Sequence, residues 1–211
     1  MTSTTGIAGA NRVNAALLFV TVGVLVWSGI GPHDRLTWAL EVLPVVVAIA
    51  LLASTYRRFR FTQLAYAAVF VHCVILCIGG HWTYSEVPIG NWLRDAWGLS
   101  RNHYDRLGHF AQGFVPAILT REIYLRKTPL KSKGWLFFTV SGVCLAFSAA
   151  FEFNEWWVAV AAGGDADAYL ATQGDQWDTQ WDMFLALCGA MIAQLSLGRI
   201  HDRQLRARGL I

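Results

Sequence analysis

The chain has 211 residues, of which 55% are hydrophobic and 15% charged, and its mean hydropathy is +0.40. This balance argues against a soluble globular domain. The net charge of +3 is spread along the chain in a way that argues against a nucleic-acid partner. Several apolar runs reach the roughly 20 residues that a helix needs to cross a bilayer. The sequence therefore predicts an all-α, polytopic transmembrane helix bundle that forms a single integral membrane domain over residues 1–211.

Six membrane-spanning helices are predicted in chain order. The first, third and fifth are clear apolar runs, whereas the second contains Glu41 and Pro44 and the fourth is visibly polar. The first run lacks a small-x-small cleavage pattern before Pro32, so we expect an uncleaved span and not a signal peptide. The predicted spans cover residues 13–31, 36–54, 61–79, 104–125, 135–157 and 181–199.

Basic residues gather on alternate connections of this bundle. Lys and Arg favour the cytoplasmic side of a membrane, and the loop over residues 158–180 contains neither. The pattern predicts that both termini are cytoplasmic. Basic clusters also suit anionic lipid headgroups, although their role in setting topology explains them more simply. The clusters are Arg57, Arg58 and Arg60; Arg126, Lys127, Lys131 and Lys133; and Arg203, Arg206 and Arg208.

Tryptophan is distributed unevenly between the two predicted faces. Of the ten tryptophans, Trp135 maps to the inner side and the other nine map to the outer half. Interfacial aromatic belts normally occupy both faces. Two interpretations stay open: outer loops that lie on the headgroup layer, or an aromatic-walled pocket that opens to the outside.

Ionisable side chains inside the predicted spans are the strongest functional signal. A charge at the centre of a bilayer costs at least about 2.5 kcal/mol, so such groups pair, bind ions or move protons. In span four, Asp105, His109 and Gln112 follow an i, i+4, i+7 spacing that places them on one helix face. The predicted topology puts all of the remaining groups at the same outer depth. They are Glu41 in span two, Glu152 and Glu155 in span five, and Asp178 and Asp182 in span six.

Helical phase brings these groups together. The acidic residues of spans five and six continue into stripes of small side chains, Ser141, Cys144 and Ser148 in one and Ala186, Gly189 and Ala193 in the other. Each stripe should face the bundle interior, because lipid would leave its polar groups unpaired. We therefore predict one outer-side site between spans four, five and six, with Glu41 as a fourth wall.

One imidazole among several carboxylates suits a divalent cation such as Mn²⁺ or Mg²⁺. The predicted metal ligands are Asp105, His109, Glu152, Asp178 and Asp182. The predicted catalytic residues are Glu152 or Glu155 as general base and His109 as ligand or proton shuttle, oriented by Asp105. A lipid or lipid-linked envelope precursor is the ligand we expect in such a membrane-embedded site.

Two other functions fit the same residues. Arg101 or Arg106 could neutralise some carboxylates and make the cluster a structural ion-pair network or a partner-docking module. A proton-coupled transporter is less favoured, because the inner halves of the last three spans are almost free of ionisable groups and no internal repeat is evident. The sequence leaves open whether the protein is an enzyme, as well as its substrate, reaction and oligomeric state.

The chain resembles known families in its polar motifs. The stretch from Tyr104 to Phe110 resembles the Asp-basic-x-x-His-Phe start of VanZ-like membrane proteins. Glu152-x-x-Glu155 stands where those proteins tend to have Glu-x-x-Gln, and Asp182 to Gly189 matches an Asp-x3-Asn-x2-Gly pattern with Ala186 in place of asparagine. As a whole, the chain is similar to the YjdF-like inner-membrane proteins. The resemblance implies a multi-pass protein of the bacterial inner (cytoplasmic) membrane and brings no reaction with it.

Overall fold

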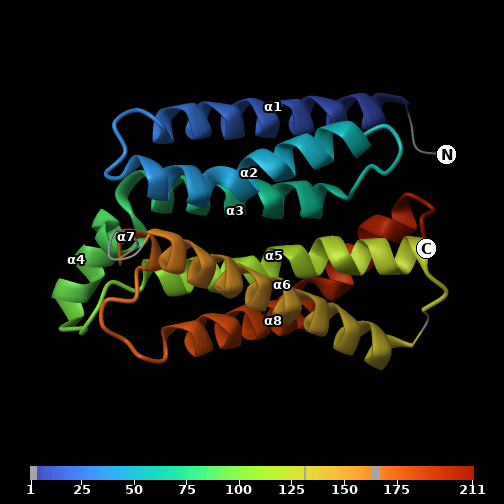
Figure 1. Cartoon of the computed structure of the whole chain (residues 1–211). Coiled ribbons are helices and arrows are strands. Elements are labelled where there is room, and N and C mark those ends of the chain that lie inside the picture. Colours follow the sequence, from blue (N-terminus) through green and yellow to red (C-terminus); the bar gives the residue numbers. More distant parts are fainter. Residues whose placement is uncertain (1–3, 131, 163–166) are drawn as a thin grey trace.

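The computed structural model describes residues 4–130, 132–162 and 167–211, and its long helices run side by side in two groups (Figure 1). Helices α1, α2 and α3 form one group, and α5, α6 and α8 form the other. Short elements lie between the long helices. In chain order the elements are α1 (Thr4–Ser28), α2 (Arg35–Thr55), α3 (Gln63–Trp82), the 3-10 helix η1 (Tyr84–Glu86), α4 (Pro88–Trp97), α5 (Tyr104–Lys127), α6 (Lys133–Ala162), α7 (Asp167–Leu170) and α8 (Asp178–Ala207).

Five of these helices, α1, α2, α3, α6 and α8, are long and apolar enough to cross a membrane. Helix α5, with 24 residues, is long enough to cross a membrane but more polar than these five helices. It packs against α3, α6 and α8, most extensively against α8. Because these neighbours shield α5 from lipid, its polar side chains do not face hydrocarbon. The all-helical, six-span prediction therefore agrees with the structure, and the most polar span is an interior one.

The two termini lie at the same end of the bundle, and α4 and α7 lie at the other end (Figure 1). The predicted cytoplasmic clusters meet at the end that carries the termini. Both Arg126 Nη1 and Arg208 Nη2 donate to the backbone oxygen of Arg60, at 2.9 and 3.0 Å. This convergence agrees with an even number of spans and with both termini on one side.

Helix α4 is an element that the sequence did not predict. It starts with Pro88 at its first turn and ends at Gly98, whose φ of +62° supplies the left-handed cap. The outer tryptophans around it are largely exposed, which favours their interpretation as residues of the membrane interface and not as the wall of a pocket. The exposed ones are Trp27, Trp82, Trp92, Trp97, Trp156, Trp157, Trp177 and Trp181.

Helices α5 and α8 approach each other through glycines. A Cβ atom on Gly113 would overlap the backbone oxygen of Ala186, and one on Gly189 would overlap the backbone oxygen of Phe110. Both glycines are buried, and Ala186 is fully enclosed. Small residues of this kind let helix backbones come together within a membrane. The small-residue stripe of span six therefore has a packing role.

A second polar cluster, centred on Glu122, links helices at the inner end of the bundle. The sequence did not predict it. Glu122 is fully buried and accepts hydrogen bonds from the N–H and Oγ1 of Thr62, at 3.0 and 2.8 Å, and from Arg126 Nη1 at 2.7 Å. The Nε2 atom of the buried His201 lies 3.0 Å from its carboxylate. Both carboxylate oxygens are thus bonded, and the cluster ties α3, α5 and α8 together.

Replacing Gly113 by alanine should weaken the α5–α8 contact. Because the new methyl group collides with backbone rather than with a flexible side chain, we expect a loss of roughly 1–3 kcal/mol in stability. Gly142→Ala is the matched control, since a Cβ there meets no atom within 4 Å. It should be neutral or slightly stabilising through helix propensity. Thermal unfolding in detergent measures both, and equal melting temperatures for the two variants would contradict the packing role.

Replacing Glu122 by glutamine should destabilise the inner end of the bundle. The substitution removes the charge of a fully buried carboxylate that pairs with the largely buried Arg126, and breaking a buried pair typically costs about 3–5 kcal/mol. Asp95→Asn is the control, because Asp95 is exposed and pairs with Arg94 at the surface, where solvent screens the interaction. Denaturation in detergent should separate the two variants clearly.

Candidate functional site

Three helices bring the predicted outer-side residues together. Asp105 and His109 occupy one face of the first turns of α5, Asp182 projects from the first turns of α8, and Glu152 comes from the last part of α6. All four side chains are buried, with relative exposures between 2 and 6%. The cluster that the helical phases predicted is therefore formed in the structure.

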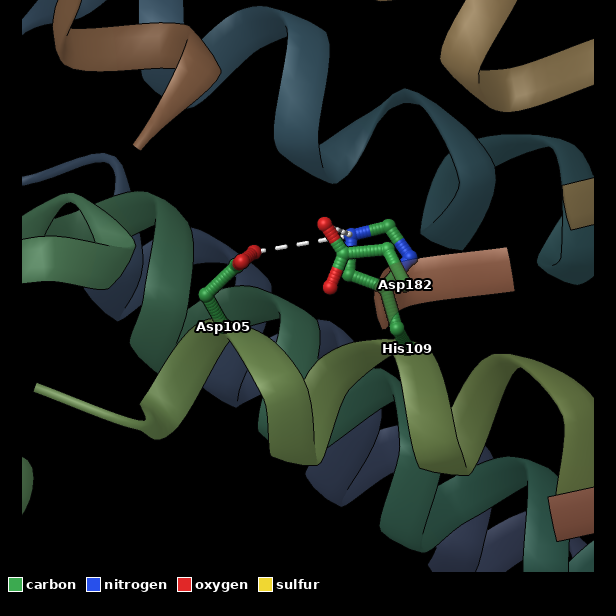
Figure 2. Close-up of side chains that lie close together, drawn as sticks. All are labelled: Asp105, His109 and Asp182. Carbon is green, nitrogen blue, oxygen red and sulfur yellow. Dashed lines mark ion pairs between the residues drawn. The ribbon is translucent and has the colours of Figure 1, made fainter. Parts of the chain in front are cut away.

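Two carboxylates point toward the imidazole of His109 (Figure 2). The Nε2 atom of His109 lies 3.5 Å from Oδ1 of Asp105 and 3.8 Å from Oδ2 of Asp182. Both distances exceed the 2.7–3.2 Å of an ordinary hydrogen bond. The three groups converge on a common point without touching one another.

The other nitrogen of the ring faces an amide. His109 Nδ1 lies 2.9 Å from Oε1 of Gln112, one turn along α5, and 3.7 Å from Oε1 of Glu152. When Nδ1 carries the proton of the neutral ring and donates it to Gln112, the Nε2 lone pair faces Asp105 and Asp182. Metal-binding histidines are held in the same way by a hydrogen bond from the nitrogen that does not bind the metal.

Arg101 neutralises a different part of the cluster. Its guanidinium donates to Asp178, which is the buried acidic residue at the start of α8, and lies 3.6 Å from both Asp105 and Asp175. It also donates to the backbone oxygen of Ala171 at 3.2 Å. The ion-pair network considered from the sequence thus exists, and Asp178 belongs to it. Although Asp178 was a predicted metal ligand, it does not belong to either group of side chains around His109 whose ligand atoms lie within 4.8 Å of one another.

Two polar residues anchor the segment that follows α7 to the loop before α5. The amide of Gln173 exchanges two hydrogen bonds of 2.9 Å with the backbone N–H and oxygen of Asn102.

His103 follows Asn102 in the chain, and its Nδ1 atom lies 3.4 Å from Nη1 of Arg106. Partial burial and the guanidinium groups of Arg106 and Arg101 lower the pKa of His103.

Three buried carboxylate oxygens accept no hydrogen bond from any residue that the structure describes. They are Oδ2 of Asp105, Oε1 of Glu152 and Oδ1 of Asp182. Buried carboxylates are costly unless their oxygens are bonded or bind a cation. This is the feature that separates the outer cluster from the fully bonded cluster around Glu122.

The spacing around His109 fits a metal ion. Two ligand atoms each about 2.1 Å from a tetrahedral cation lie about 3.4 Å apart, and the observed separations are 3.5 and 3.8 Å. Two groups of three side chains share His109, and within each group the possible ligand atoms all lie within 4.8 Å of one another. The groups are Asp105, His109 and Asp182, and His109, Glu152 and Glu155. Glu155 is half-buried, and its place in the second set puts it beside the same imidazole.

Several residues around the cluster were not recognised from the sequence. Tyr84 is buried and lies beside Gly108, where an added Cβ would come within 2.8 Å of its ring. Tyr169, in α7, accepts a hydrogen bond from Asn154 at 2.8 Å and lies within electrostatic range of Glu155 and Glu152. The contact between Tyr84 and Gly108 had one signal in the sequence, a glycine in span four that leaves room for an aromatic side chain. Glu41, the predicted fourth wall, is buried in α2 within electrostatic range of Asp105.

Comparison with known proteins gives a family but no reaction. Residues 13–203 match the family described as "Predicted membrane protein (DUF2238)". The chain is 49% identical over 199 residues to the Inner membrane protein YjdF of Escherichia coli (strain K12), an alignment that covers 94% of this chain and 95% of that protein. No solved structure matches the chain.

These matches extend over nearly the whole bundle, including the three helices that carry the outer cluster. Together with the apolar helices, they identify a multi-pass protein of the bacterial inner membrane whose function is unknown. The chain belongs to the DUF2238 family of predicted membrane proteins and is YjdF-like.

Proposed function

We propose that this protein binds a divalent cation at its outer-side cluster and uses it to bind and modify a lipid or a lipid-linked envelope precursor. The observation that carries the proposal is the convergence of Asp105, His109 and Asp182. Their possible ligand atoms lie within 4.8 Å of one another, with Asp105 Oδ1 and Asp182 Oδ2 facing Nε2 of His109. Of the two remaining oxygens, Asp182 Oδ1 accepts no hydrogen bond from a described residue, and Asp105 Oδ2 lies 3.6 Å from Arg101 Nη2.

The balance of charge favours a cation over a purely internal ion-pair network. Two basic groups, Arg101 and His109, lie among a larger number of carboxylates. Arg101 is directed mainly at Asp178 and Ala171, so it contributes little to Asp182 or Glu152. A divalent ion would supply the missing positive charge and the missing ligand for the unbonded oxygens. The six carboxylates are Glu41, Asp105, Glu152, Glu155, Asp178 and Asp182.

The arrangement divides naturally into ligands and a base. Asp105, His109 and Asp182 would hold the cation, and three protein ligands leave coordination positions open for water or substrate. A cation in such a site polarises a phosphoester or lowers the pKa of bound water. Glu155, near His109 but outside this ligand set, would act as general base.

The position of the cluster supports a lipid-like substrate. It lies at the outer ends of α5, α6 and α8, among helices that expose tryptophans at the same end. A molecule held at the interface, with its polar headgroup beside the cluster and its chains in the bilayer, has direct access to such a depth.

The purified protein should be stabilised by a divalent cation through its outer cluster. We expect Mn²⁺ or Zn²⁺ to raise the melting temperature in detergent, because a ligand at 100 times its Kd adds about 2.7 kcal/mol of stability. Asp182→Asn should abolish the shift. Asp95→Asn, which changes an exposed carboxylate on the same side, should retain it.

A purely structural role of the cluster makes a different prediction. In that case Asp182→Asn would change the melting temperature by the same amount with and without metal. Equal and negligible metal content in the wild-type and Asp182→Asn proteins, measured by mass spectrometry of the elements, would exclude the cation and leave the ion-pair module as the function.

Lipid extracts of cells test the modification itself. Cells that lack this protein should differ from wild-type cells in at least one lipid or lipid-linked envelope species, and the wild-type gene should restore it. Glu155→Gln should bind metal normally but fail to restore the species, because it removes the base and keeps the ligands. Identical extracts in all strains would contradict a modifying activity.

A further inference from the structure

A second site lies in the opposite half of the membrane, between α1, α2 and α3. The three helices enclose a pocket of about 350 Å³ whose walls are mainly apolar, including Leu17, Leu52 and Phe70. Ala15, Leu18 and Ala53 in its lining are exposed on the bundle surface, so the pocket opens toward the lipid. Its volume falls within the 300–1,000 Å³ of ordinary small-molecule sites.

The inner end of this pocket is polar and incompletely bonded. Tyr56 donates to Oδ1 of Asn11 at 2.9 Å and accepts from Nδ2 of Asn14 at 3.0 Å. The Oδ1 atom of Asn14 is buried and receives no hydrogen bond within the described part of the chain. Asn14 is only 9% exposed and lines the pocket. The unbonded oxygen therefore calls for a donor, such as a hydroxyl group, from a bound molecule.

Positive charge surrounds the same end. The guanidinium carbon of Arg60 lies 5.2 Å from the ring centroid of Tyr56, a residue that lines the pocket. Arg57 and Arg58 follow Tyr56 directly and are exposed. Three arginines at a predicted cytoplasmic interface attract anionic headgroups, at roughly 1 kcal/mol for each basic residue.

We propose that this pocket holds one acyl chain of an anionic, hydroxyl-bearing glycerophospholipid of the inner leaflet. The apolar lining takes the chain, Arg60 and its neighbours take the phosphate, and Asn14 accepts from the headgroup hydroxyl. The lining runs from Asn11 to Thr21 on α1, which at 1.5 Å per residue is about 15 Å. That depth is half of a hydrocarbon core of about 30 Å, and so it matches one leaflet.

Lipid retention measures this site directly. The detergent-purified protein is incubated with mixed micelles of equal phosphatidylglycerol and phosphatidylcholine, separated by gel filtration, and analysed for bound lipid by mass spectrometry. We expect the wild-type protein to retain phosphatidylglycerol over phosphatidylcholine. Ala53→Phe, which fills the pocket, should retain roughly tenfold less. Val47→Phe is the matched control on the same helix, because Val47 is exposed and lies outside the pocket.

A second variant tests recognition of the headgroup and leaves the apolar walls of the pocket intact. Arg60→Gln should lower phosphatidylglycerol retention roughly fivefold without changing phosphatidylcholine retention. Equal retention of the two lipids by the wild-type protein, or retention by Ala53→Phe that equals that of Val47→Phe, would overturn the proposal and indicate nonspecific boundary lipid. Asp95→Asn, which changes an exposed carboxylate outside both proposed sites, should retain lipid like the wild-type protein.

Discussion

The requirement that a polar helix be shielded from lipid is the constraint on which this bundle depends. Helix α5 carries Asp105, His109 and Glu122 within one span, and a bilayer cannot solvate them. The fold meets this requirement by surrounding α5 with α3, α6 and α8. Gly113 and Gly189 allow α5 and α8 to come into backbone contact, and this contact fixes Asp182 opposite His109. The same contact between α5 and α8 therefore packs the bundle and sets the geometry of the site.

The two ends of α5 show two solutions for a buried carboxylate. At the inner end, Glu122 is bonded through both oxygens by Thr62, Arg126 and His201, so the cluster is complete within the protein. At the outer end, Asp105 and Asp182 each keep an oxygen without a donor from the described residues. Complete networks make the fold rigid, whereas buried oxygens without a donor need an explanation such as water or an ion, and this difference is what supports the proposed cation site. The difference between the ends is the reason for assigning function to one and structure to the other.

The sequence predicted much of this arrangement because membrane helices follow strict periodic and charge rules. The i, i+4 spacing of Asp105 and His109 placed both on one face, and the basic loops placed that face at the same depth as Glu152 and Asp182. It did not predict α4, a helix of 10 residues that is too short to cross a membrane. It also did not predict the Glu122 cluster, because its partners Thr62 and His201 are 60 and 79 residues away in the chain.

The sequence predicted the helical class, the spans, their orientation and the depth of the acidic residues in the membrane. These properties depend on local hydropathy and charge, which each segment carries independently of its neighbours. Tertiary structure alone decided which partner each carboxylate has. It gave Asp178 to Arg101, placed Asp105 and Asp182 around His109, and formed the pocket at Asn14. Pairing depends on how the helices pack against one another, and that geometry is not encoded within any one span.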